Sequence, residues 1–279
     1  MGQPPTPAQV RLLAILRGLR DGAGLTTYQL AERLRWNQSK VTRAENGRVR
    51  LSAAEVTEWA QATGADEATR EELSQLAYAA ATEARSWHIS HRGGLAARQN
   101  EMARMDRAAT QIAHFQPSVI PGLLQSESYA RRVMTMSDVS GKGGIDAGVK
   151  ARMKRQAILR QGGRRFDYVL TEAALRWRPG PRQVMEEQLG KLLASAALPS
   201  VSLSVIPLDR EARTWYSQGF AVFRGMPDGP EILTEGYTKE DFLRDERDVE
   251  TYERIFALLR ESALTGSDAV EFARAAILG

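Results

Sequence analysis

A group of polar and basic side chains between Gln38 and Arg43 has the residue types that read the edges of DNA bases. A glutamine amide pairs bidentately with adenine, and lysine or arginine pairs with guanine, in the major groove. If Asn37 caps a helix here, we expect its solvent face to present five candidate base contacts. These are Gln38, Ser39, Lys40, Thr42 and Arg43.

Side chains on either side of this group are candidates for binding DNA phosphates. The backbone amides that open the preceding helix, near Thr26 and Thr27, could hold one phosphate. Arg48 and Arg50 follow the group in a loop and are interpreted as phosphate contacts. Residues 33–50 carry six basic side chains and one acidic side chain, a net charge of +5, although the whole chain carries only +4.

Two short helices must hold these residues in place, and their spacing is that of a helix-turn-helix. Thr26 is expected to cap the first helix, and Asn37 the second, which ends at Asn46-Gly47. Counted from Thr27, a small residue stands at position five, where the helices touch. Apolar residues stand at positions four, eight, ten, fifteen and eighteen. The expected packing set is Leu30, Ala31, Leu34, Trp36, Val41 and Ala44.

The stretch LTTYQLAERLRWNQSKVTRAENG, residues 25–47, resembles the XRE-type (lambda-repressor-like) helix-turn-helix regulators. The resemblance implies a five-helix domain that binds DNA. Two positions depart from that family's pattern. Arg35 stands where glycine is usual, which costs roughly 1 kcal/mol if the backbone there is left-handed. Thr27 stands where the first helix usually opens with glutamine.

Length and composition limit the alternatives. The 279 residues are long enough for two domains, and 43% hydrophobic residues argue against disorder. The absence of cysteine excludes disulfides, thiolate metal sites and cysteine nucleophiles. No apolar run has the roughly 18–20 residues of a membrane span. We therefore expect a soluble cytoplasmic protein, associated with the nucleoid, with no membrane partner and no cofactor.

The hydrophobic pattern predicts a mainly α protein with an α+β second domain. Residues 1–85 are expected to form the helix-turn-helix domain, 86–100 a linker, and 101–279 an α+β regulatory or partner-binding domain with a small sheet. Strands are predicted at 166–171, 201–206, 220–223 and 232–234. Helices are predicted at 95–114, 123–136, 147–161, 181–193, 246–265 and 267–278.

The second domain carries a resemblance of its own. The segments IPGLLQSESYA at 120–130, RMKRQAIL at 152–159 and EAALR at 172–176 are similar to those of WhiJ-like actinobacterial regulators. In that family an XRE-type domain precedes a C-terminal domain of unknown function. The resemblance implies transcriptional control and a small companion protein in an antitoxin-like arrangement.

Several residues of the second domain are candidates for a partner or an effector. Arg152 and Arg155 belong to a segment, 142–165, of net charge +7, and residues 208–279 have a net charge of −6. The basic helix could grip a phosphate or an acidic partner, or it could rest on the acidic C-terminal third within the protein. Aromatic residues could line an apolar effector pocket, although most of them are more often expected to pack in the hydrophobic core. They are Trp177, Trp215, Tyr216, Phe220 and Phe223.

Catalysis and metal binding have little support. No nucleophile elbow or glycine-rich fingerprint is present, and nothing fixes the separation of Glu172, Glu235, Glu240 and Asp241. Gly141-Lys142 lacks the flanking residues of a phosphate loop. His88 and His91 have no third ligand for zinc. We expect no enzyme activity and no metal site.

These patterns together predict a sequence-specific transcriptional regulator that binds a double-stranded DNA operator. One short recognition helix rarely supplies enough specific affinity, so we expect a homodimer that reads paired half-sites. A small-molecule effector and a small companion protein are further possible partners. The alternative is an antitoxin-like interaction protein that sequesters the companion, with DNA binding secondary or lost.

Overall fold

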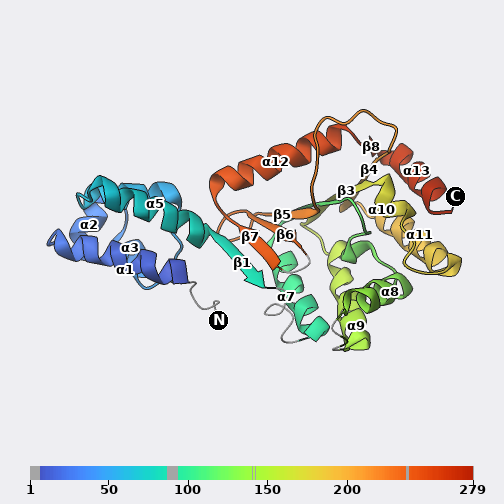
Figure 1. Ribbon diagram of the computed structural model, residues 1–279, viewed down its shortest axis with the longest axis horizontal. Coiled ribbons are helices and arrows are strands. Elements are labelled where there is room, and N and C mark those ends of the chain that lie inside the picture. The colour runs from blue at the N-terminus through green and yellow to red at the C-terminus, as the bar shows by residue number, and fades with distance from the viewer. Residues whose placement is uncertain (1–6, 87–93, 140, 142, 237–238, 279) are drawn as a thin grey trace. The chain divides into compact units, whose positions relative to one another are not determined.

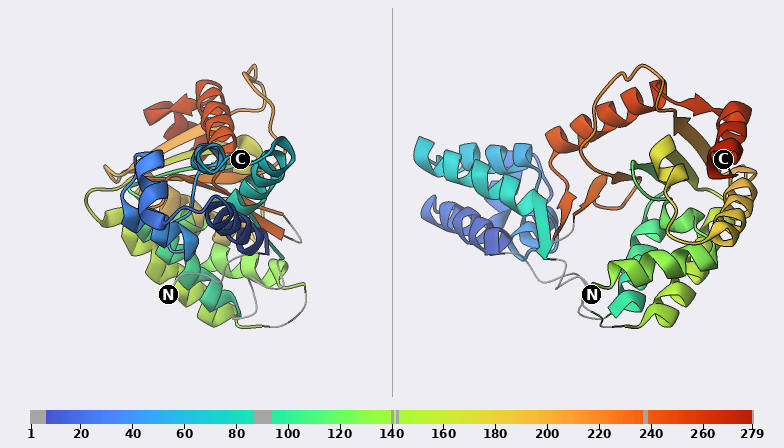
Figure 2. Two further views of the ribbon diagram at one scale, coloured as in Figure 1. Left: turned by 90° about the vertical axis from the view of Figure 1, so that its left-hand side faces the viewer. Right: turned by 45° about the vertical axis from the view of Figure 1, so that its right-hand side comes forward.

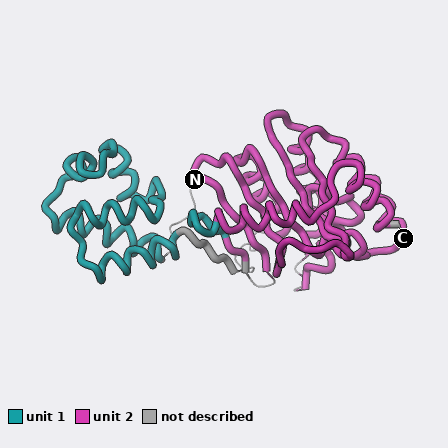
Figure 3. Tube along the Cα trace, turned by 90° about the horizontal axis from the view of Figure 1, so that it is seen from above, with its two compact units in different colours: residues 1–83, 242–248 teal, residues 84–241, 249–279 magenta. Residues whose placement is uncertain are grey.

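The computed structural model describes residues 7–86, 94–139, 141, 143–236 and 239–278 (Figure 1). The chain divides into two compact units (Figure 3). Unit 1 comprises Met1–Glu83 and Phe242–Asp248, and unit 2 comprises Ala84–Asp241 and Val249–Gly279. The predicted fold class is confirmed, because a five-helix N-terminal unit precedes an α+β unit and helix predominates.

Unit 1 is built from five helices around one apolar core. They are α1 (Pro7–Gly22), α2 (Thr27–Leu34), α3 (Gln38–Glu45), α4 (Ala53–Ala62) and α5 (Glu67–Ala81). At the centre of the core Leu30, Val41 and Trp59 are completely buried. The indole of Trp59 donates a hydrogen bond of 3.1 Å to the carbonyl of Leu16, so its buried N–H is satisfied.

Side-chain caps define where the short helices of unit 1 begin. The oxygens of Thr26, Asn37 and Ser52 accept backbone N–H bonds at the first turns of α2, α3 and α4. Such a cap satisfies an otherwise unpaired amide and stabilises a helix by about 1 kcal/mol. Helices of eight to ten residues are marginal alone, so these caps and the packing of the apolar faces hold them in place.

A single mixed sheet contains all the strands of the described chain. They are β1 (Thr82–Ser86), β2 (Gln111–Gln116), β3 (Arg165–Thr171), β4 (Val201–Ile206), β5 (Phe220–Arg224), β6 (Glu231–Glu235), β7 (Lys239–Leu243) and β8 (Leu264–Thr265). Their order is β1-β7-β6-β5-β2-β3-β4-β8. Strand β2 pairs parallel with β3 and antiparallel with β5, and β3 pairs parallel with β4.

Helices of unit 2 cover both faces of the central strands. Helix α12 (Glu246–Glu261) lies along one face, whereas α7 (Gly94–Ala108), α8 (Glu127–Ser137) and α9 (Ile145–Arg155) lie on the other side (Figure 2). The remaining elements are η1 (Gly122–Leu124), η2 (Gln156–Arg160), α10 (Glu172–Arg176), α11 (Arg182–Ala196) and α13 (Gly266–Leu278). None of the described helices is long and apolar enough to cross a membrane.

The sheet is larger than the sequence predicted. The helix expected over residues 95–114 ends at Ala108, and Gln111–Gln116 forms the strand β2. No proline or glycine separates these two elements, and β2 is stabilised by its two neighbouring strands, which lie far away in sequence. The helix expected over 246–265 likewise ends at Glu261, and the short strand β8 follows.

The predicted linker, residues 86–100, coincides only partly with described residues. Residues 87–93 lie outside the described part of the chain, and residues 94–100 are the first turns of α7. The seven residues Phe242–Asp248 group with unit 1, although Phe242 lies 159 positions after Glu83 along the chain. No local pattern in the sequence predicts that these seven residues group with unit 1.

Candidate nucleic-acid interface

The start of α2 is fixed by a reciprocal cap. The amide of Gln29 donates to the Thr26 hydroxyl at 3.2 Å, and the amide of Thr26 donates to the Gln29 side-chain oxygen at 2.9 Å. Such a capping box holds the chain where it enters the helix. It keeps the first amides of α2, at the candidate phosphate contacts Thr26 and Thr27, in a defined direction.

The turn between α2 and α3 is left-handed. Arg35 has φ 55° and ψ 34° and is the single non-glycine residue with positive φ in the described chain. Its amide donates to the Glu32 carbonyl at 3.2 Å, and the amide of Trp36 donates to the Ala31 carbonyl at 2.9 Å. The turn therefore has the conformation for which glycine is usual, and an arginine adopts it at a cost of roughly 1 kcal/mol.

The six residues expected to pack the motif lie at the contact between α2, α3 and α4. Leu30, Ala31, Leu34, Val41 and Ala44 are buried. Trp36 is half-buried and packs edge-on against Trp59, with 6.2 Å between the ring centroids. This packing fixes the angle between the two motif helices and leaves the other face of α3 to solvent.

The exposed face of α3 presents four of the five candidate base contacts. Gln38, Ser39, Thr42 and Arg43 are exposed. The side-chain amide of Gln38 donates a hydrogen bond of 3.1 Å to the hydroxyl of Thr27. This bond joins the first residue of α3 to the first residue of α2, and it orients the glutamine amide.

Lys40 departs from the expectation that it projects freely from α3. Its ammonium forms an ion pair of 2.5 Å with Glu55 and lies 3.9 Å from the centre of the Trp36 ring. The Lys40 side chain is accordingly only 28% exposed. These contacts link α3 to the turn and to α4, and they differ from the free projection that was expected of Lys40.

An ion pair and several hydrogen bonds hold the side chain of Glu55 in place. Burial by itself would raise the pKa of Glu55, but the bonds from Lys40 and from Ser52 outweigh it and lower the pKa below its ordinary value of 4.5. The amide of Ser52 donates to the carboxylate of Glu55 at 2.7 Å, while the amide of Glu55 donates to the Ser52 hydroxyl. One carboxylate therefore caps α4 and neutralises Lys40.

The acidic residue in the basic segment 33–50 is neutralised from α1. Arg20 forms an ion pair of 2.5 Å with Glu45, and both side chains are largely buried. Arg17 donates to the carbonyl of Glu45 at 2.7 Å, at the end of α3. Glu45 thus has its ion-pair partner on α1, and Arg43 makes a different contact. Its guanidinium donates to the carbonyl of Ser39 at 3.2 Å and remains exposed.

The loop after α3 carries the two remaining candidate phosphate contacts. Gly47 has φ 66°, a left-handed conformation that ends the helix, and the amide of Arg48 donates to the carbonyl of Arg43 at 2.8 Å. Arg48 and Arg50 are both exposed. They extend the basic surface beyond the C-terminal end of α3.

Two basic residues of unit 2 were expected to meet a partner or effector, and the structure places them inside the domain. Arg155 forms an ion pair of 2.5 Å with the buried carboxylate of Asp106, on α7. Arg152 donates to the side-chain oxygen of Gln125 at 2.5 Å, and burial lowers the pKa of Arg152 to about 10. The intramolecular alternative therefore holds, with Asp106 of α7 and Gln125 after η1 as the acceptors in place of the acidic C-terminal third.

The aromatic candidates do not converge on one pocket. Phe220 and Phe223 are buried core residues of β5. Trp177 packs edge-on against Tyr129, Tyr216 lies 5.1 Å from Phe115 between ring centroids, and Trp215 is 80% exposed. None of the five lines the hollow beside α12 or the one beside η2 in the described part of unit 2.

The carboxylates considered for catalysis have structural partners. Glu172 accepts hydrogen bonds from Arg176 at 2.5 Å and from the amide of Leu208 at 2.9 Å. Glu235 and Glu240 both pair with the buried guanidinium of Arg98. His88, His91 and Lys142 lie outside the described residues. Within the described ranges, no group of three acidic or histidine residues has the arrangement of a metal site.

Comparison with protein families identifies both parts of the chain. Residues 11–73 match a family described as a helix-turn-helix domain. Residues 99–275, more than half of the chain, match a family described as "Domain of unknown function (DUF5753)". The chain belongs to the DUF5753 family. Its N-terminal unit is a helix-turn-helix domain.

Other comparisons add little to this assignment. The comparison with curated proteins finds no relative. A solved structure described as that of TrmBL2, an archaeal chromatin protein with a novel mode of DNA binding, covers 87% of this DUF5753 chain and 88% of its own. The identity is 13% and the TM-score is 0.33, a likeness too weak to support an argument about function.

Sequence reasoning missed two residues that organise the interface of this DUF5753 protein. Glu55 stands three residues after Ser52, which is the spacing of a capping box and is a signal available in the sequence. Arg20 has no such signal, because its partner Glu45 lies 25 residues away and meets it only after α1 packs against α3.

Proposed function

We propose that the protein is a sequence-specific transcriptional regulator of the XRE type, in which α3 enters the major groove of an operator. The observation that carries the proposal is the exposed row Gln38, Ser39, Thr42 and Arg43 on a helix fixed by packing and caps. Residues near the start of a recognition helix are those that reach base edges. Rigid presentation of such side chains is what direct readout needs.

The two positions most suited to base readout are Gln38 and Arg43. A glutamine amide has two N–H donors and one carbonyl acceptor. One donor of Gln38 is used by Thr27, so one donor and the acceptor remain for a bidentate contact with adenine. The guanidinium of Arg43 is exposed and unpaired with any acid of the described residues, which suits a guanine or a phosphate.

Phosphate contacts follow from the basic residues beside the helix. The exposed side chains of Arg48 and Arg50 lie directly after α3, and the first amides of α2 lie at Thr26 and Thr27. Contacts of this kind position a protein on the duplex without reading its sequence. We assign these four residues to that role.

A homodimer is part of the proposal. Four exposed side chains on a helix of eight residues read only a few base pairs, which gives too little discrimination within a genome. Two copies bound to half-sites about one helical turn apart, roughly 34 Å, supply the remaining sequence discrimination. Light scattering of the free protein and of its operator complex measures the stoichiometry, and one chain per operator would contradict the dimer.

An antitoxin-like role is the second candidate, and one observation favours a protein partner. Trp215 is 80% exposed in the loop between β4 and β5, where a large apolar side chain contacts water. Aromatic residues in such positions are typical anchors of protein interfaces. Trp215→Ala should weaken binding of a small companion encoded beside this gene, whereas DNA binding should be unchanged.

A gel-shift titration on the promoter of its own gene tests the main proposal. The expected result is binding at least a thousandfold tighter than to a shuffled duplex of equal composition at the same salt concentration, a ratio typical of specific regulators. Equal affinity for the two duplexes, combined with tight binding of the companion, would favour the antitoxin-like role.

A further inference from the structure

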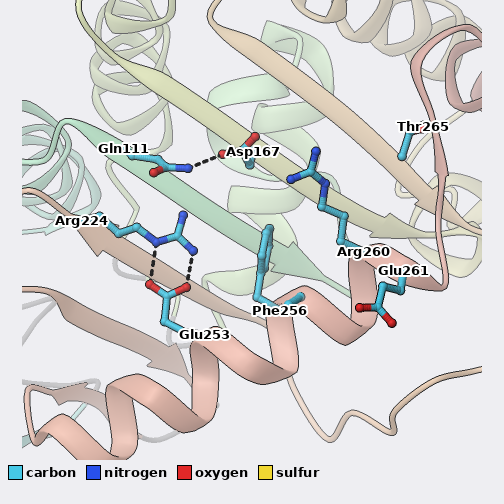
Figure 4. A pocket seen from close by; sticks show the side chains of 9 residues that line it. Gln111, Asp167, Arg224, Glu253, Phe256, Arg260, Glu261 and Thr265 are labelled. Carbon is cyan, nitrogen blue, oxygen red and sulfur yellow. Dashed lines mark hydrogen bonds and ion pairs between the residues drawn. The ribbon is translucent and has the colours of Figure 1, made fainter.

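A hollow of about 430 Å³ lies between α12 and the sheet, entirely within unit 2 (Figure 4). Strands β2, β3 and β5 contribute Gln111, Asp167 and Arg224, and α12 contributes Glu253, Phe256 and Arg260. Volumes of this size hold a small molecule, and mixed apolar and charged linings orient it. None of these residues has a role in the helix-turn-helix.

The carboxylate of Asp167 is the buried polar group of this hollow. Asp167 is only 4% exposed. One of its oxygens accepts from the Gln111 amide at 2.6 Å, and the other accepts from Arg165 at 3.3 Å. Each carboxylate oxygen has two acceptor positions, so both retain capacity for a further donor.

Arg224 and Glu253 form a bidentate ion pair and line the same hollow as Asp167. The guanidinium of Arg224 donates to both oxygens of Glu253, with an Nε–Oε1 distance of 2.6 Å. This bidentate pair raises the pKa of Arg224, and the nearby charge of Asp167 raises it further. The Arg224–Glu253 pair neutralises itself, and Asp167, whose ion pair with Arg165 is longer at 3.3 Å, is the acid that the sheet contributes to the hollow.

Arg260 supplies a cation from the opposite wall. Its guanidinium has no hydrogen bond or ion pair with the described residues. Figure 4 shows the side chain extending from α12 toward the sheet, past the ring of Phe256. An unpaired guanidinium is well suited to bind a carboxylate, because its planar fork matches the two oxygens.

We infer that this hollow binds a small zwitterionic ligand of the amino-acid class. Its ammonium group would meet Asp167, its carboxylate would meet Arg260, and Phe256 would provide an apolar wall between them. Asp167 on the sheet and Arg260 on α12 have the opposite charges that the two ends of such a ligand require, and Glu261 of α12 also lines the hollow. The inference is independent of DNA binding and can be tested on the full chain without DNA.

Titration calorimetry of the full chain with each proteinogenic L-amino acid tests this inference. At least one of them should bind, and its decarboxylated amine and its deaminated acid should each bind at least about tenfold more weakly, since each loses one charged contact. No binding by any amino acid would overturn the inference. An amine that binds as tightly as its parent would also overturn it, because the site would then recognise a cation alone.

Substitutions assign the ligand to this hollow. Arg260→Gln and Asp167→Asn should each weaken binding by roughly tenfold or more. Arg254→Gln is the matched control, because Arg254 is an exposed arginine of α12 outside the lining. Arg260 is also exposed, so its variant should keep the fold even if Asp167→Asn does not. Unchanged affinity in Arg260→Gln would place the ligand elsewhere and overturn the inference.

Discussion

The side-chain amide of Gln38, the first residue of α3, donates a hydrogen bond of 3.1 Å to the hydroxyl of Thr27, the first residue of α2. The two helices of the motif are thus joined at their N-terminal ends by polar side chains as well as by the apolar residues between them. The bond restricts the rotation of the glutamine amide. It therefore determines which of its atoms point toward a bound duplex.

Removal of the Thr27 hydroxyl should reduce the discrimination exerted by Gln38. Thr27→Val keeps the side-chain shape but frees the amide to rotate, so the preference at one base pair should fall by about 1 kcal/mol. Gln38→Ala should cost about 1–3 kcal/mol at the same base pair. Competition binding with operators mutated one base pair at a time measures both values. Thr57→Val is the control, because that exposed hydroxyl bonds only to its own helix, at the Ala53 carbonyl.

Lys40 should contribute to stability and not to base preference. Lys40→Ala removes a partly exposed ion pair with Glu55 and a cation–π contact with Trp36, for a loss of roughly 1 kcal/mol in the free energy of unfolding. Urea unfolding measures this loss, and the operator series measures base preference. A variant of unchanged stability that no longer distinguishes one base pair would show that Lys40 reads DNA after all.

Arg48 should contribute equally to the binding affinity for all DNA duplexes, whatever their sequence. Arg48→Ala removes one expected phosphate contact, which should lower the slope of log affinity against log salt concentration by about 0.9. The ratio of specific to nonspecific affinity should be nearly unchanged. Arg70→Ala, at an arginine of α5 outside the motif, should leave the slope as in the wild type. If both variants give the wild-type slope, the assignment of Arg48 is wrong.

Arg35→Gly should stabilise unit 1. Arginine at φ 55° is strained, whereas glycine adopts this conformation freely, so the free energy of unfolding should rise by about 1 kcal/mol. Arg33→Gly is the opposite control, because it places glycine inside α2 and should lower stability by about 1 kcal/mol. A loss of stability in Arg35→Gly would mean that the arginine side chain makes a favourable contact that outweighs the strain.

His114 should make unit 2 sensitive to acid. Burial lowers the pKa of His114, on β2, to about 4, whereas the unfolded chain has a value near 6.5. Between these values the unfolded chain binds a proton that the folded chain does not, so stability falls as the pH falls. From pH 7 to pH 5 the loss should be about 2 kcal/mol.

His114→Gln tests this origin of the acid sensitivity, because the other two histidines remain in the variant. Its free energy of unfolding should differ less between pH 7 and pH 5 than that of the wild type. An equal difference in the two proteins would show that another group causes the effect. Measurement at both pH values separates this effect from any general loss of stability caused by the substitution.

The helix-turn-helix could be predicted from the sequence because its signals are local. The caps Thr26 and Asn37 and the small residue Ala31 all act within a few residues of one another. The contact of Lys40 with Glu55 could not be predicted, because Glu55 stands 15 residues away, beyond the reach of a helical-face argument. Side-chain exposure on a short helix depends on what packs beside it.

The sheet was predicted less completely for a related reason. Strands β3 and β4 are long and apolar, with turn residues at their ends, so the pattern is visible in the sequence. Strand β2 follows a helix with no break, and its conformation is determined by pairing with β3 and β5. The hollow under α12 depends on the same pairing, which brings Gln111, Asp167 and Arg224 together from three separate strands.

Selection of bound sequences from a random pool of duplex DNA, with the full-length protein at physiological salt, tests the central claim most directly. The account predicts enrichment of one motif with two related half-sites, and loss of the preference at one base pair of each half-site in Gln38→Ala. Failure of the wild-type protein to enrich any sequence, or enrichment of an identical motif by the Gln38→Ala variant, would contradict the assignment of α3 as the recognition helix.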